Sequence, residues 1–189
     1  MNKLRPYAYA DDADLISWSA AGDRRAFDQI VVRHGPFALR VASRLASDYL
    51  TAEDIVQEAM VRAWSRSADF DPRRARFTTW LYRIVVNLCI DHRRRVRPEP
   101  MPDYLDPPDP AISADERLVR GEQHAVLAQA LKNLPVRQRA AMTLVYDEGL
   151  SGAETARILG LSTKAVERLL ARARATLRER LKAESWQET

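Results

Sequence analysis

Residues 151–177, SGAETARILGLSTKAVERLLARARATL, carry the pattern that most limits what this chain can fold into. They predict two short helices joined by a tight turn. Ser151 and Glu154 have the spacing of a capping box, which predicts the start of the first helix. Gly160 supplies the backbone freedom that a sharp turn needs, and Ser162 can cap the second helix. The segment therefore predicts a helix-turn-helix.

The second predicted helix has two chemically different sides, because successive residues of an α-helix lie about 100° apart. One side collects the apolar residues Val166, Leu169, Leu170, Ala173 and Leu177. The opposite side carries Lys164, Glu167, Arg168, Ala171 and Arg178, with Arg172 at its edge. Residues 157–182 contain eight Lys or Arg and two Glu, which suits contact with phosphate. This favours a helix that enters a DNA major groove; the alternative is an ordinary helical hairpin with a solvated basic face.

The composition favours an all-α protein. Apolar residues make up 46% of the 189-residue chain, enough for a packed core, and only six glycines accompany the long helical patterns. A single cysteine, Cys89, excludes an intramolecular disulfide framework and a multi-cysteine zinc site. No apolar run reaches the ~18 residues of a membrane span, and the N-terminal sequence lacks the apolar run of a signal peptide. We therefore expect a cytoplasmic protein.

A proline-rich acidic segment divides the chain in two. Five prolines fall between Pro98 and Pro108, and each one blocks the continuation of a helix. Residues 98–116 also carry six acidic side chains and no basic one, a composition typical of an extended or disordered tether. We therefore expect two small helical domains, joined by a flexible linker. Their predicted ranges are 11–97 for the first domain, 98–113 for the linker and 114–184 for the second domain.

Helical periodicity runs through the first predicted domain. Apolar residues of the segment 27–45 recur at the spacing of a buried helix face. The Gly-Pro pair at 35–36 predicts a break or a new helix there. Thr51 with Asp54 predicts the cap of a helix that ends near Trp64.

Three further helices are predicted beyond residue 76. The segment 77–95, FTTWLYRIVVNLCIDHRRR, has the length and apolar content of a helix. Ser113 with Glu116 forms another capping box, which predicts a helix that ends near Asn133. Pro135 is expected to open the helix that leads to the helix-turn-helix.

The order of these segments resembles one protein family. AEDIVQEAMVRAW at 52–64, then FTTWLYRIVVNLCIDHRRR, then LPVRQRAAMTLVYDEGLS and the helix-turn-helix are similar to the extracytoplasmic-function (ECF) sigma factors of bacterial RNA polymerase. The resemblance runs from about Asp14 to Leu181. It implies sigma regions 2 and 4 for the two domains, with core RNA polymerase, promoter DNA and an anti-sigma factor as partners. It also implies that polymerase, and not this chain, performs the chemistry.

The resemblance assigns the helix from Thr51 to polymerase docking. Asp54, Gln57 and Glu58 share one face of that helix together with Val61. In the family the matching segment contacts the clamp helices of the largest polymerase subunit, and region 4 contacts the flap of the second-largest subunit. The alternative is an acidic helix start that favours its own macrodipole.

The resemblance assigns the helix at 77–95 to the −10 element, which the family reads as an unpaired strand. Exposed aromatic rings there can stack on bases, an amide can hydrogen-bond a base edge, and arginines can hold phosphates. The preceding loop, about 69–76, accepts a flipped base in the family. The candidate residues are Phe77, Trp80, Tyr82, Asn87, Arg93 and Arg94, with Arg95 and Arg97 in the same basic cluster. Trp80 and Leu81 as core residues remain the alternative.

The resemblance assigns the basic helix to the −35 element. Lys164, Glu167, Arg168, Ala171 and Arg172 fall at the base-facing positions. Arginine can fork to guanine, and glutamate can accept from the cytosine amino group. Glu167 either reads a cytosine or pairs with Arg168. Lys164 and Arg178 are expected to hold the DNA backbone.

Two other classes of function have to be weighed. A stand-alone helix-turn-helix regulator explains the C-terminal domain, but it leaves the DIVQE segment and the aromatic helix without a function. An enzyme finds little support, because the three histidines lie in separate segments and no phosphate loop or nucleophile elbow is present. Cys89 lies in an apolar run and is expected in the core. We expect no cofactor and no metal.

Overall fold

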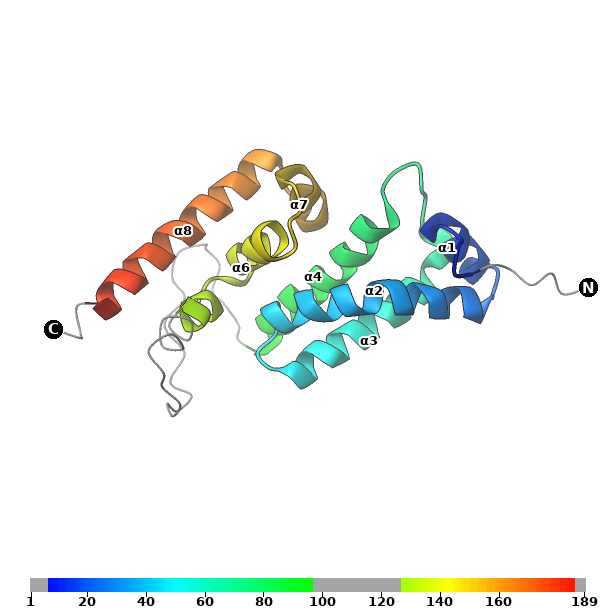
Figure 1. Ribbon diagram of the computed structural model, residues 1–189, viewed down its shortest axis with the longest axis horizontal. Helices are drawn as coiled ribbons and strands as arrows, with labels where there is room; N and C mark the ends of the chain where they lie inside the picture. Colours follow the sequence, from blue (N-terminus) through cyan, green and yellow to red (C-terminus); the bar gives the residue numbers. More distant parts are fainter. Residues whose placement is uncertain (1–6, 97–126, 186–189) are drawn as a thin grey trace, which may run out of the picture. The chain divides into compact units, whose positions relative to one another are not determined.

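The computed structural model describes residues 7–96 and 127–185, and within these ranges the chain forms helices and turns without a strand. Residues 127–132 are also helical. The linker and the predicted cap at Ser113 lie outside the described residues. The helices, shown in Figure 1, are α1 (Asp12–Ala20), α2 (Arg24–Leu45), α3 (Tyr49–Ser65), η1 (Ser67–Asp69), α4 (Phe77–Val96), α6 (Val136–Met142), η2 (Thr143–Asp147), α7 (Gly152–Leu159) and α8 (Thr163–Ser185).

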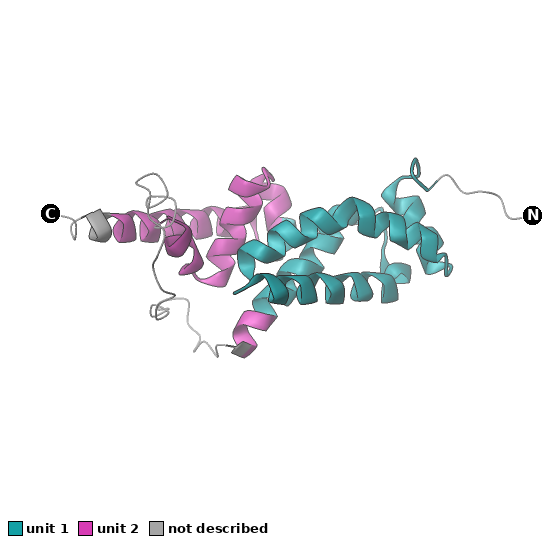
Figure 2. Ribbon diagram, turned by 60° about the horizontal axis from the view of Figure 1, so that its bottom comes forward, with its two compact units in different colours: residues 1–91, 157–160 teal, residues 92–156, 161–189 magenta. Residues whose placement is uncertain are grey.

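The chain divides into two compact units (Figure 2). The first unit comprises residues 1–91 with the short stretch 157–160, and the second comprises the remaining residues. The all-helical fold predicted from the sequence is therefore confirmed. The predicted domain boundaries at residues 11, 97, 114 and 184 stay a prediction. No helix in the described part of the chain is long and apolar enough to cross a membrane.

The first unit is built around α2, which packs against both α1 and α3. Its apolar positions recur every three or four residues, so one side of the helix is buried along its length. A neighbouring helix covers each part of that side, and water is excluded from the shared core. Among residues 7–91, the largest fully buried side chains are Leu15, Ile30, Val41, Leu45, Leu81, Val85 and Val86.

α2 is one continuous helix, so the break predicted at Gly35-Pro36 is wrong. A proline inside a helix removes one hydrogen bond, here to the carbonyl of Val32. Pro36 is exposed and Val32 is 68% exposed, so water can reach the carbonyl that lacks its partner. Buried residues on either side of the proline, such as Ile30 and Val41, hold the two halves in line.

α3 begins earlier than the sequence predicted. Asp48, and not Thr51, is its N-cap: the Asp48 carboxylate accepts a hydrogen bond of 2.8 Å from the Thr51 backbone N–H. The Thr51 hydroxyl donates to the other oxygen of Asp48 at 2.8 Å. An aspartate is a strong N-cap because its acceptor oxygens satisfy N–H groups at the positive end of the helix. Thr51 therefore supports the cap from within the first turn.

In the second unit, α8 packs against α6 and against the helical residues 127–132. Ala130, Leu134, Ala173 and Leu177 form the buried cluster, with Leu131 and Met142 against it. Pro135 is the N-cap of α6, one residue before the position that was predicted for it. α6 continues directly into η2, a π-helix, which the sequence pattern did not indicate.

Pro36→Ala should stabilise the protein. The substitution restores a backbone donor in the interior of α2, and proline costs about 3 kcal/mol relative to alanine in a helix. We expect the free energy of unfolding to rise by about 1–3 kcal/mol, measured by urea denaturation followed by circular dichroism. Val32→Ala on the same exposed surface is the control and should shift it by less than about 0.7 kcal/mol. A destabilised Pro36→Ala variant would contradict this account.

Candidate nucleic-acid interface

The helix-turn-helix has the local geometry predicted for it. The Ser151 hydroxyl accepts from the Glu154 N–H at 3.2 Å, and Glu154 Oε2 accepts from the Ser151 N–H at 3.0 Å. This is the reciprocal capping box. Gly160 has φ of +66°, a left-handed conformation that a residue with a Cβ rarely adopts. Ser162 Oγ accepts from the Ala165 N–H at 3.2 Å and caps α8.

α8 is amphipathic, with a buried apolar side and an exposed polar side, as the sequence predicted. Val166, Ala173 and Leu177 are buried, and Leu169 and Leu170 are half-buried. Every predicted DNA-facing residue is exposed: Lys164, Glu167, Arg168, Ala171, Arg172 and Arg178. Along the helix axis these positions extend over about 20 Å. The exposed side of α8 is therefore available to a partner, while its role in reading bases stays a prediction.

The exposed side of α3 carries the residues assigned to polymerase docking. Asp54, Gln57 and Glu58 are all exposed, whereas Ile55 and Ala59 on the other side are buried. Glu58 accepts a hydrogen bond from Arg62 Nε at 2.6 Å, so its carboxylate is partly occupied within the helix.

Two apolar side chains extend this surface. Leu50 and Val61 lie one turn to either side of the acidic residues, with exposures of 73% and 60%. Val61 was predicted on this face and Leu50 was not, although Leu50 lies four residues before Asp54 and therefore on the same side of the helix. The surface is thus an acidic centre between two exposed apolar residues, a composition typical of a protein interface.

The prediction that Phe77 and Tyr82 are exposed is wrong: their exposures are 4% and 7%. The Phe77 ring lies 5.3 Å from the His34 ring, measured between centroids, and the Tyr82 ring stacks on Phe37 at 3.8 Å. These ring contacts join α4 to α2. Phe77 and Tyr82, which were expected to face DNA, therefore belong to the core of the domain.

The remaining −10 candidates reach the surface. Asn87 and Arg94 are exposed, and Trp80 and Arg93 are half-buried. The Trp80 side chain is therefore partly packed against the domain and partly accessible to solvent. Arg97, the last member of the predicted basic cluster, lies outside the described residues.

The loop before α4 forms one side of a pocket of about 370 Å³. Its other walls come from the start of α1 and the start of α4. The lining residues are Asp12, Ala13, Phe70, Pro72, Ala75, Arg76, Phe77 and Thr78. Phe70 was missed by sequence analysis; its ring lies 5.6 Å from both the Phe77 ring and the Trp80 ring, between centroids. The pocket thus joins an aromatic cluster to a carboxylate and a guanidinium.

Asp71 organises the loop itself. The Arg73 guanidinium donates to both Asp71 carboxylate oxygens, at 3.0 and 3.1 Å, and Arg74 Nε lies 3.6 Å from the same carboxylate. The hydrogen bond from the Arg73 side chain is the main reason why the pKa of Asp71 is lowered. Both arginine side chains remain highly exposed, so the loop carries positive charge at the edge of the pocket.

Two glycines of the helix-turn-helix should respond in opposite directions to alanine. Gly160→Ala forces a Cβ into the left-handed region and should destabilise the protein by roughly 1–2 kcal/mol. Gly152→Ala lies in α7, where the new Cβ meets Thr163 Cγ2 at an ordinary 3.7 Å. It should stabilise by roughly 0.5–1 kcal/mol. Urea denaturation measures both, and a neutral Gly160→Ala would show that the turn does not need the positive φ.

Asp71→Asn should loosen the loop before α4. The lowered pKa means that the carboxylate favours folding when it is charged. This contribution is present above the unfolded pKa and is lost as the pH falls through the lower folded pKa. Asparagine mimics the protonated state at neutral pH, so trypsin should cut after Arg73 and Arg74 several-fold faster, as mass spectrometry can measure. Asp69→Asn in η1 is the matched control, and equal cleavage rates in all three proteins would refute this role.

The comparisons with known proteins agree with this arrangement. Residues 30–99 match the family described as Sigma-70 region 2, and residues 124–177 match Sigma-70, region 4. The ECF RNA polymerase sigma factor SigM of Mycobacterium tuberculosis is 38% identical over 88% of this chain and 82% of the relative. The RNA polymerase sigma factor CnrH of Cupriavidus metallidurans is 37% identical over 93% of this chain and 97% of the relative.

Solved structures give the same result. CnrH in complex with the cytosolic domain of CnrY has a TM-score of 0.67 and 33% identity, covering 91% of this chain and 97% of that one. The sigma factor RpoE in complex with the anti-sigma factor NepR, from Bartonella quintana, has a TM-score of 0.58 and 25% identity, covering 82% and 96%. Because both helical units match, the stand-alone regulator finds no support. The chain belongs to the ECF sigma factors of the sigma-70 family, which are transcription initiation factors and not enzymes.

Proposed function

We propose that this protein binds core RNA polymerase and directs it to promoters whose −35 and −10 elements it reads with separate surfaces. The observation that supports this most is the separation of sides on α8, where every predicted DNA-facing residue is exposed and the opposite side is buried. In this proposal the protein acts in the cytoplasm, where polymerase and promoter DNA are present.

The −35 element would be read by the exposed side of α8 in the major groove. Arg168 and Arg172 can each donate two hydrogen bonds to a guanine, and Glu167 can accept one from a cytosine. Lys164 and Arg178 lie toward the two ends of this surface and would hold phosphates. Phosphate contacts supply sequence-independent affinity, while the arginine and glutamate contacts supply the preference for a sequence.

The −10 element would be held as a single strand over α4 and the loop before it. Stacking of one base on an aromatic ring contributes about 1–3 kcal/mol, and removal of a base from the duplex costs a few kcal/mol. Half-buried Trp80 packs against Phe70, which lines the pocket, and so offers such a ring surface next to the pocket. Exposed Asn87 and Arg94 would contact a base edge and a phosphate. The pocket before α4 would receive one flipped base.

Polymerase docking would use the acidic side of α3. Asp54, Gln57 and Glu58 are exposed there, and Leu50 and Val61 supply apolar area at the two ends. By analogy with the family, the partner is the pair of clamp helices of the largest subunit. The second unit would contact the flap of the second-largest subunit by the same analogy.

Control by an anti-sigma factor is part of the proposal. RpoE of Bartonella quintana, which resembles this chain, has been solved with the anti-sigma factor NepR. CnrH, another relative, has been solved with the cytosolic domain of CnrY. An inhibitor of this kind would compete for the surfaces that bind polymerase and promoter.

Transcription by purified core polymerase tests the proposal. With the wild-type protein, run-off transcripts from specific promoters should appear. Asp54→Arg should remove these transcripts by lowering the affinity for core polymerase at least about tenfold, because it reverses a charge at the interface. Arg168→Ala should keep the affinity for polymerase but relax the preference at one base pair of the −35 element, at a cost of about 1–3 kcal/mol.

Matched variants separate these effects from general damage. Asp28→Arg reverses an exposed charge on α2 and should retain promoter-specific transcription. Arg174→Ala removes an exposed arginine, whose Nε donates to the Leu170 carbonyl, on the same side of α8 as Glu167. As a phosphate contact it should weaken binding to all promoters alike, without the relaxed base preference expected of Arg168→Ala. If wild-type protein binds a specific duplex without polymerase and never stimulates transcription, the proposed function is wrong.

A further inference from the structure

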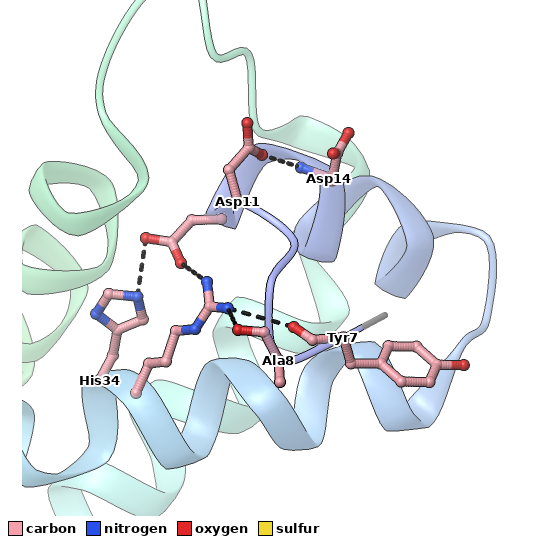
Figure 3. A network of polar contacts seen from close by, with 7 residues as sticks. Tyr7, Ala8, Asp11, Asp14 and His34 are labelled. Atoms are coloured by element: carbon pink, nitrogen blue, oxygen red, sulfur yellow. Dashed lines mark hydrogen bonds and ion pairs between the residues drawn. The ribbon is translucent and has the colours of Figure 1, made fainter. Parts of the chain in front are cut away.

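Polar contacts from α2 hold the start of α1 in place, as Figure 3 shows. Arg33 Nη1 donates to Asp12 Oδ1 at 3.1 Å, and His34 Nε2 lies 2.9 Å from Asp12 Oδ2. Arg33 Nη2 donates to the backbone carbonyls of Tyr7 and Ala8, at 3.2 and 2.9 Å. We call Asp12, Arg33 and His34 the α1 clamp. It connects one carboxylate and two carbonyls before or at the start of α1 to neighbouring residues of α2.

The α1 clamp adjoins the pocket before α4 on two sides. Asp12, together with Ala13, forms the wall that α1 contributes. His34 is 8% exposed and packs against the ring of Phe77, which belongs to the α4 wall. Arg33 is not among the lining residues. His34 therefore contacts both the α1 wall, at Asp12, and the α4 wall, at Phe77, whereas Arg33 contacts the α1 wall through Asp12.

The contacts of the α1 clamp are suited to fixing the position of the Asp12 side chain. Both carboxylate oxygens of Asp12 are engaged by different side chains, which fixes the rotation of the carboxylate as well as its distance. Asp12 and Arg33 have side-chain exposures of 26%, so solvent screens their attraction less than it screens a fully exposed pair. A hydrogen-bonded arginine fork is also directional, because the guanidinium is planar. Loss of Arg33 would leave the His34 contact to Asp12 but remove the contacts to Asp12 Oδ1 and to the carbonyls of Tyr7 and Ala8, which should loosen the start of α1 relative to α2.

We propose that Arg33 and His34 are positioning residues for the binding of an unpaired base, because they set the α1 wall of the pocket through Asp12. This inference rests on the proposed function of the pocket. A pocket whose walls are already placed binds its occupant without the cost of ordering them. The clamp then contributes to promoter opening although Arg33 does not line the pocket.

Promoter opening by the complete holoenzyme tests this inference. The probes are promoter fragments with one abasic site at each position of the non-template −10 element in turn, and open complexes are counted by permanganate reactivity. Wild type is compared with Arg33→Ala and with Arg25→Ala, which removes an exposed arginine from the first turn of α2. Thermal unfolding and the affinity for core polymerase are measured for each variant, so that loss of folded protein is detected separately.

We expect Arg33→Ala to reduce opening of the intact promoter by about 3- to 10-fold, the coupling typical of groups that act through shared contacts. On the template that lacks the base entering the pocket, wild type and Arg33→Ala should open equally. On every other abasic template the difference should persist, and Arg25→Ala should behave as wild type throughout. Arg33→Ala combined with Asp12→Ala should be no weaker than Asp12→Ala alone.

Three results would overturn the inference. A deficit of Arg33→Ala that is equal on all templates would mean that the clamp only stabilises the fold, while the proposed function still holds. If Arg33→Ala opens the intact promoter at the wild-type rate, the clamp does not contribute to opening and the inference is wrong, while the proposed function still holds. Failure of the wild-type holoenzyme to open any promoter would refute the proposed function, and this inference with it.

Discussion

Burial of one side of α2 is the interaction on which the first unit depends. α2 contacts α1 and α3 through its apolar positions, and its aromatic and histidine side chains meet the rings of α4. A helix that packs against several neighbouring helices cannot bend freely, because a bend would disrupt its packing against each of them. This explains why α2 continues through Pro36 at the expense of a backbone hydrogen bond, which is lost on the exposed side of the helix.

The same packing decides which aromatic side chains of α4 remain accessible at the surface. Phe77 and Tyr82 are taken into the contact between α4 and α2, whereas Trp80 keeps an accessible part. The loop before α4 then supplies Phe70, whose ring meets Phe77 and Trp80 at the pocket. The core and the candidate site are thus continuous: Phe77 is a core residue on one side and a pocket wall on the other. A substitution in this region is expected to change both the stability of the domain and the proposed binding of a base.

Charge is distributed differently over the two units, which suits different partners. The exposed side of α3 is acidic with apolar ends, and the exposed side of α8 is basic with one glutamate. Basic side chains attract phosphate at long range and lose this attraction in salt. An acidic surface with apolar ends repels nucleic acid and favours a protein partner. In the proposed function the protein binds polymerase and DNA at once, and separate surfaces of opposite charge would avoid competition between the two partners.

The sequence by itself determined the features that depend on neighbours along the chain. The capping box at Ser151, the left-handed turn at Gly160 and the two sides of α8 follow from helix geometry within a few residues, so the family resemblance and most surface residues could be predicted. Tertiary structure alone decided the burial of Phe77 and Tyr82, the continuity of α2 at Pro36 and the pocket between α1 and α4. The α1 wall of the pocket, for example, depends on the contact between Asp12 and His34, which lie far apart in sequence and which no local pattern brings together. Local hydrogen bonds can be predicted from the spacing of residues along the chain. The burial of a side chain depends on which part of the chain, distant in sequence, packs against it and excludes water.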